Sequence, residues 1–129
     1  MKTAYCKTNS GGKMKKTIVF TVLLLSFSLS CSKKEITVPD CIKSLISEFG
    51  FCVGSGTVGQ YSFQGKIVYL FDPGTCGADM MAPVYNESCE CIGSLGGIAG
   101  INEVNGVPFS SNAKLLRTIW KDGSFTGND

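Results

Sequence analysis

The fold is decided by residues 58–71, which read VGQYSFQGKIVYLF. In the first half, apolar and polar residues alternate, the period-two pattern of a half-buried strand. Gln64-Gly65 then predicts a two-residue hairpin turn, in which Gly65 is the flexible residue. Residues 66–71 are apolar on both faces, which is typical of a central strand. The stretch therefore predicts a β-hairpin at the middle of a sheet.

Two stretches with helical periodicity flank this hairpin. In the first, apolar residues recur at i, i+3, i+4 and i+7, at Ile42, Leu45, Ile46 and Phe49. In the second, Ser110-Ser111-Asn112 offers an N-cap, and one apolar stripe follows at Leu115, Leu116, Ile119 and Trp120. Both stretches predict amphipathic helices packed on a core.

Further turns between these stretches complete a meander. Residues 83–85 are expected to pair with residues 89–92 in a second hairpin with residues 86–88 at its tip, and Asn105-Gly106 predicts a third turn. The order helix, meander, helix predicts an α+β fold, in which a small antiparallel sheet carries an N-terminal and a C-terminal helix on one face.

The N-terminal region has the pattern of a bacterial signal peptide. Met14, the expected true start, is followed by Lys15-Lys16 and by an apolar run over residues 18–29. At about 1.5 Å per residue this run is shorter than the roughly 30 Å hydrocarbon core of a bilayer. We therefore expect residues 1–30 to be a leader rather than a permanent membrane helix.

Cys31 follows the leader directly, after small residues, in an arrangement that resembles a lipobox. A lipobox usually has leucine three residues before the cysteine, whereas here Ser28 holds that position and Leu29 follows it. Ordinary cleavage with Cys31 as a disulfide partner is therefore the alternative. A lipidated Cys31 predicts anchoring to the membrane by several acyl chains. We expect residues 31–38 to form a tether, residues 39–123 one folded domain, and residues 124–129 a disordered tail.

The charge of the chain divides at the same point. The formal net charge is +2, but residues 1–30 hold five lysines and no acid, whereas the remainder has seven basic and ten acidic residues, a net charge of −3. A mildly acidic domain lacks the basic surface that nucleic-acid binding requires. We therefore expect no nucleic-acid partner.

Five of the seven cysteines fall within the predicted domain, at Cys41, Cys52, Cys76, Cys89 and Cys91. An odd number implies one spare thiol or an intermolecular bond. Local pairing, Cys41 with Cys52 and Cys76 with Cys89, is the simplest arrangement among the fifteen ways of choosing two disulfides. Cys89 and Cys91 lie on one face of a predicted strand, so either is a possible partner of Cys76. The alternatives are a zinc site or a redox pair built from these three cysteines.

The sequence offers little for catalysis. It contains no histidine, so the commonest general base is absent, and no serine lies in a G-x-S-x-G motif. We expect no catalytic residue, no metal site and no cofactor. The exposed candidates are instead two glycine-containing loops, residues 72–79 and 93–100, because loops on a rigid scaffold often carry binding residues. Their candidate contact residues are Asp72, Gly74, Asp79, Gly96 and Gly97.

Four segments carry a resemblance to a known family, namely YSFQGKIVY at residues 61–69, DPGTCGAD at 72–79, LGGIAG at 95–100 and TIW at 118–120. Over residues 41–121 the chain resembles a family of small bacterial lipoproteins that is known only as a domain of unknown function. The resemblance implies a lipid anchor and two disulfides among Cys41, Cys52, Cys76 and Cys89, with Cys91 as an additional cysteine. It implies no activity, substrate or catalytic residue.

These observations together predict a lipid-anchored protein of the bacterial cell envelope, attached to the outer membrane on its periplasmic face or at the cell surface. We expect a binding module without catalytic activity, whose partner is an envelope protein or a glycan. The alternatives are a thiol–disulfide redox protein and an inhibitor of a partner enzyme.

Overall fold

The fold is taken from a computed structural model, in which residues 37–77 and 79–126 are described. The predicted leader, the lipidation of Cys31 and most of the predicted tether lie outside these residues. Within the described ranges, no helix has the length and apolar character needed to cross a membrane.

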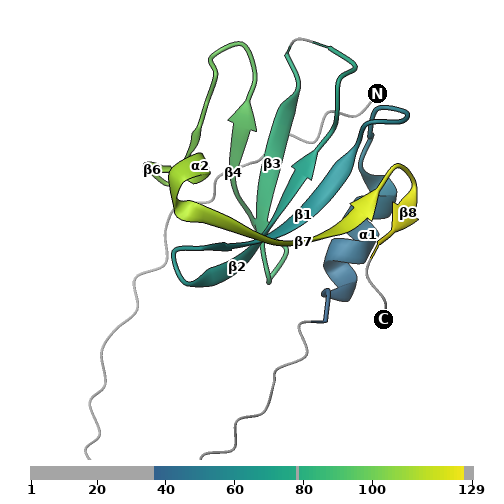
Figure 1. The fold of residues 1–129 in the computed structure, drawn as a ribbon, viewed down its shortest axis with the longest axis horizontal. Coiled ribbons are helices and arrows are strands. Elements are labelled where there is room, and N and C mark those ends of the chain that lie inside the picture. The colour runs from purple at the N-terminus through teal and green to yellow at the C-terminus, as the bar shows by residue number, and fades with distance from the viewer. Residues whose placement is uncertain (1–36, 78, 127–129) are drawn as a thin grey trace, which may run out of the picture.

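The domain is mostly β and is organised around one antiparallel sheet (Figure 1). The order of the strands in this sheet is β4-β3-β2-β1-β7-β8. Their bounds are Thr57–Phe63 for β1, Lys66–Asp72 for β2, Met81–Asn86 for β3, Cys91–Gly96 for β4, Ala113–Lys121 for β7 and Ser124–Phe125 for β8. A separate hairpin joins β5 (Glu103–Val104) to β6 (Val107–Pro108), and the helices are α1 (Asp40–Glu48) and the one-turn α2 (Phe109–Asn112).

The predicted central hairpin is confirmed. β1 and β2 pair antiparallel along their whole length, from Phe63 opposite Lys66 to Thr57 opposite Asp72. The turn between them consists of Gln64 and Gly65, with φ angles of 50° and 74°, the conformation that two-residue hairpin turns require. β2 is flanked by β1 and β3 and has buried residues on both faces, as expected of a central strand.

The predicted N-terminal helix is also confirmed, as α1. Its apolar stripe places Ile42 and Ile46 in the core on one face of the sheet. The other buried members of this first core are Val58, Tyr69, Phe71, Tyr85 and Ile119. Burial of the α1 stripe against the sheet stabilises a helix that, at nine residues, would be marginal alone.

A buried polar network links the three strands beneath this core. Gln60 is fully buried; its Nε2 donates to the Tyr69 hydroxyl at 3.1 Å, and its Oε1 accepts from Arg117 Nε at 2.8 Å. The three residues lie opposite one another on β1, β2 and β7. Burial raises the pKa of the Tyr69 phenol, because the ionised form is poorly solvated there.

The second face of the sheet has a smaller core. Its buried residues are Phe63, Val68, Val84, Val104 and Phe109. Val68 and Tyr69 are consecutive on β2 and belong to different cores, so the two cores lie on opposite faces. Val104 of β5 and Phe109 of α2 belong to the second core, so the β5–β6 hairpin and α2 cover this face over part of its area.

The predicted C-terminal helix is wrong. Residues 109–112 form only the single turn of α2, and the chain then enters β7, which pairs with β1. Without β7, β1 would be an edge strand with an unpaired backbone, and pairing outweighs the local helical pattern. Only Ile119 of the expected stripe is buried, whereas Leu115 and Leu116 are exposed. The two helices therefore do not share one face, as the α+β prediction required.

Of three smaller predictions, one is confirmed and two need adjustment. Asn105 and Gly106 do form a turn, between β5 and β6. The second hairpin exists, but β4 begins at Cys91 and continues through Gly96, so part of the expected glycine loop is strand. Ser124 and Phe125, expected in a disordered tail, form β8.

Candidate binding groove

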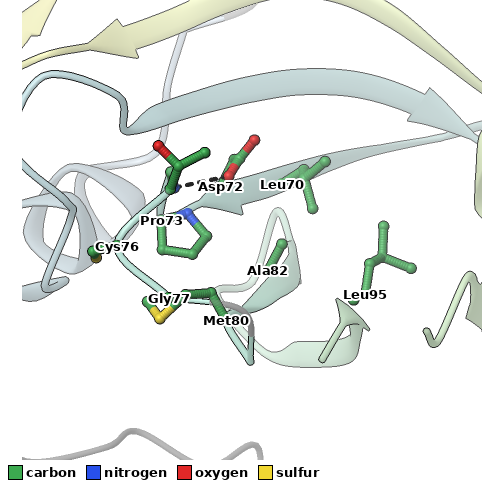
Figure 2. A pocket seen from close by; sticks show the side chains of 11 residues that line it. Leu70, Asp72, Pro73, Cys76, Gly77, Met80, Ala82 and Leu95 are labelled. Atoms are coloured by element: carbon green, nitrogen blue, oxygen red, sulfur yellow. Dashed lines mark hydrogen bonds between the residues drawn. The ribbon is translucent and has the colours of Figure 1, made fainter. Parts of the chain in front are cut away.

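A groove of about 740 Å³ lies at one end of the sheet, where the chain leaves β2 and enters β3 (Figure 2). Its lining residues come from β2, β3, β4 and the connection from β2 to β3, and they are Leu70, Asp72, Pro73, Gly74, Thr75, Cys76, Gly77, Met80, Ala82, Leu95 and Gly96. The groove therefore joins segments that are well separated in the sequence.

The floor of the groove is apolar and continues the second core. Leu70 and Leu95 pack against that core, and Ala82 lies opposite Leu95 in the β3–β4 pair. Since residues two apart on a strand share a face, Leu70 lies on the same face as Val68, and Ala82 on the same face as Val84. The β5–β6 hairpin does not cover this end of the face, so these side chains are only partly buried.

One wall of the groove is the turn that follows β2, and several bonds fix it. The Asp72 carboxylate accepts from Gly74 N at 2.9 Å, and Ser55 Oγ accepts from Thr75 N at 3.1 Å. Cys52 N donates to Pro73 O at 2.8 Å. Asp followed by Pro-Gly is a typical turn sequence, and these bonds join the turn to the loop before β1.

The opposite wall is formed where β4 ends. Gly96 and Ile101 exchange backbone hydrogen bonds of 2.7 and 3.0 Å, which folds the following loop back on the strand. Gly97 N donates to Met80 O at 3.1 Å, so this loop contacts the end of the β2–β3 connection. The two walls are therefore linked through Met80.

The comparison with known families matches the part of the chain that contains this groove. A family model described as a domain of unknown function, DUF6970, matches residues 53–122. The chain is a member of the DUF6970 family. No curated protein and no solved structure matches it. The matched segment begins after Cys52, so α1 precedes it and every strand from β1 to β7 lies within it.

The DUF6970 groove includes three of the five residues proposed from sequence as loop contacts. Asp72, Gly74 and Gly96 line it, and Gly97 adjoins it through its bond to Met80. Asp79 is exposed in the same connection but is not among the lining residues. The two loops named from the sequence thus meet in one groove.

Sequence reasoning missed the apolar floor of the groove. Leu70, Ala82 and Leu95 were not among the candidates, because apolar residues on a strand are usually assigned to the core. Alternation along β2 is the signal that separates them: Tyr69 and Phe71 fall on one face, and Leu70 on the other.

The electrostatics of the groove are dominated by a single carboxylate. Asp72 is the one charged side chain among the lining residues. Burial, and to a lesser degree the negative charge of Asp72, raise the pKa of the Tyr61 phenol. The negative charge of Asp72 therefore acts on Tyr61 of the neighbouring strand β1.

Two disulfides connect the elements around the DUF6970 sheet, in a pairing different from the local one expected. Cys41 of α1 is bonded to Cys89, with 6.1 Å between the Cα atoms, and Cys52 is bonded to Cys76, with 5.5 Å. The local pairing is wrong because α1 crosses the sheet towards the β3–β4 turn, and because the loop before β1 lies against the turn after β2.

The remaining cysteine of the described domain, Cys91, is disulfide-bonded as well. Cys89 lies in the turn before β4 with φ of 62°, rather than on the strand with Cys91 as expected. Cys76 and Cys89 are each bonded to another cysteine, so the three thiolates that the zinc alternative required are not available together. For the same reason neither Cys89 nor Cys76 is the partner of Cys91, as the redox alternative expected. Disulfides persist in oxidising compartments, so the bonds indicate an extracytoplasmic location.

Proposed function

We propose that this protein is a lipid-anchored binding module of the bacterial envelope, and that the groove is its binding site. The observation that supports this most directly is the convergence of the 72–79 and 93–100 segments on one apolar depression. An apolar concavity with a few polar groups at its margin is the usual form of a ligand site. No catalytic residue is assigned.

The occupant of the groove is a segment of polypeptide rather than a glycan. Sugar rings bind well to exposed aromatic faces, whereas the lining contains no aromatic side chain. Leucine, alanine, methionine and proline instead offer an apolar surface for side chains of a protein partner. Of the two partner classes expected from the sequence, an envelope protein or a glycan, we therefore propose the protein.

The walls of the groove suit it to a recognition role. The disulfide from Cys52 to Cys76 and the backbone bond from Cys52 to Pro73 hold the first wall in place before any partner arrives. A site that is already ordered loses less conformational entropy when it binds. The proposed module therefore presents a preformed surface.

The anchor is proposed to be Cys31, with residues 32–38 as a short tether. Extracytoplasmic disulfides are consistent with export, and two or three acyl chains hold a protein on a bilayer stably. Intact-mass measurement of protein extracted from membranes tests this point. We expect an acylated N-terminus beginning at Cys31. An unacylated product in which Cys31 is the disulfide partner of Cys91 would contradict the anchor without affecting the groove.

Site-specific photo-crosslinking in cells tests the groove. A photoreactive amino acid at Leu95 is expected to give a discrete adduct with one envelope protein, and the same residue at Val53, which is fully exposed outside the groove, is expected to give none. Ala82→Glu, which introduces a charge into the floor, should abolish the Leu95 adduct. Equal labelling from both positions, or no adduct from Leu95, would contradict a binding role for the groove.

A further inference from the structure

The charges of the described domain are unevenly placed around the groove. Asp72 is its only charged lining residue, and Asp79 is exposed in the same connection. No basic residue is among the lining residues: Lys43 is on α1, Lys66 is at the opposite end of β2 from Asp72, and Lys114, Arg117 and Lys121 are on β7, where Lys121 pairs with Thr57, the β1 residue opposite Asp72. The groove is therefore an apolar surface with an acidic margin.

The Asp72 carboxylate is held in position without being neutralised. Its Oδ1 accepts the 2.9 Å bond from Gly74 N, which fixes the side chain at the start of the turn. Within residues 37–77 and 79–126, Lys43 forms an ion pair with Asp40, whereas Asp72 forms no ion pair. Asp72 is exposed, so a cationic group on a partner has access to it.

The spacing of Leu70 and Asp72 matches that of an extended peptide. They are two residues apart on β2 and share a face, which separates them by about 7 Å along the strand. Alternate side chains of an extended ligand have the same separation. A peptide lying along β2 can thus place an apolar side chain over Leu70 and a second side chain beside Asp72 (Figure 2).

We propose that the groove binds an extended polypeptide segment in which an apolar residue is followed two positions later by lysine or arginine. This inference rests on the proposed function of the groove as a binding site. The apolar side chain lies on the floor made by Leu70, Ala82 and Leu95, and the cation pairs with Asp72. An acidic segment would be repelled at the same margin, so charge provides specificity more than affinity.

A charge-swap titration tests this assignment on the full chain, held in nanodiscs of zwitterionic lipid. The probes are the labelled hexapeptide Leu-Thr-Lys-Thr-Leu-Thr and its counterpart with glutamate in place of lysine. We expect the lysine peptide to bind at least tenfold more tightly, and the preference to weaken at high salt because charges at an exposed margin are screened.

Three variants separate the charge from the fold. Asp72→Asn keeps an oxygen to accept from Gly74 N and should bring the two peptides to within about threefold of each other; Asp72→Lys should favour the glutamate peptide. Glu48→Lys makes the same charge change on α1, which packs on the other face, and should leave the preference intact.

Equal binding of the two peptides to the unaltered chain would overturn the inference, as would a preference that survives Asp72→Asn. Failure of both peptides to bind would also overturn the inference. That result is expected if cationic residues of the chain's own tether, or of a second copy of the chain, already occupy the groove. The Leu95 crosslinking result is independent of these outcomes, so an adduct without any charge preference would leave the proposed function standing.

Discussion

Replacing Gly74 with alanine is expected to destabilise the wall of the groove that follows β2. The φ angle of Gly74 is +87°, in the left-handed region that residues with a Cβ rarely adopt. A Cβ at this position would lie 2.7 Å from the carbonyl carbon of Ser55 and 2.8 Å from its oxygen, and it would also meet Ser55 Oγ. Because two of these atoms are backbone, the clash cannot be relieved by rotating a side chain.

The size of the effect follows from two contributions. The left-handed conformation costs an alanine about 1–2 kcal/mol. Displacing a packed neighbour costs typically about 1–3 kcal/mol. The free energy of unfolding should therefore fall by about 2–5 kcal/mol in Gly74→Ala.

Gly65→Ala is the matched control. Gly65 has a φ angle of +74°, but a Cβ there would meet no atom within 4 Å. This variant should lose only the conformational contribution of about 1–2 kcal/mol. The difference between the two variants measures the contact of the turn with Ser55.

Urea unfolding followed by tryptophan fluorescence provides the assay. Trp120 is the single tryptophan of the chain, and its ring packs on Phe51 with 4.0 Å between centroids, so its emission should report loss of the fold. If Gly74→Ala were no less stable than Gly65→Ala, the close approach of the turn to Ser55, and with it the fixed wall, would be refuted.

Three further predictions use the same unfolding assay. Replacing both Cys52 and Cys76 with serine opens a loop of sequence separation 24, so the free energy of unfolding should fall by about 3.5 kcal/mol; a loss below about 1 kcal/mol would mean that this crosslink is unimportant. Gln60→Leu leaves the buried Tyr69 hydroxyl without its partner and should cost about 1–3 kcal/mol, whereas an unchanged urea midpoint would argue against the network. Burial raises the pKa of Tyr85 above 10.0, so the stability it contributes is complete below pH 10.0 and is lost as the pH rises through the folded-state pKa. Tyr85→Phe should therefore flatten the alkaline loss of stability, and an identical pH profile would contradict the assignment.

The parts of the fold that sequence predicted are those fixed by neighbouring residues. The 58–71 hairpin depends on alternation and on the turn at Gly65, both of which are local. The conformation of the 113–121 segment does not follow its local pattern, because its environment is set by β1, fifty or more residues earlier in the chain. Leu115 and Leu116 match a helical stripe, but strand pairing of the β1 edge decides their conformation.

The candidate site was predictable to a similar extent. The sequence predicts Asp72, Gly74 and Gly96 as loop residues, because aspartate and glycine are residue types that favour turns. Leu70 is not predicted, since its exposure depends on how far the β5–β6 hairpin extends over the sheet. The partners of Cys41 and Cys52 likewise depend on the direction in which α1 crosses the sheet, which no local pattern encodes.

The bond between Cys41 and Cys89 determines how the domain responds to tension. Residues 42–88, which include most of α1 and the first three strands, lie within the loop that it closes. A pull on the chain ahead of Cys41 is transmitted through sulfur directly to the turn before β4, so the enclosed elements are not drawn out. If the domain is held by its N-terminal side, such a pull would first load the strands that follow Cys89, and β4, which lines the groove, is the first of them.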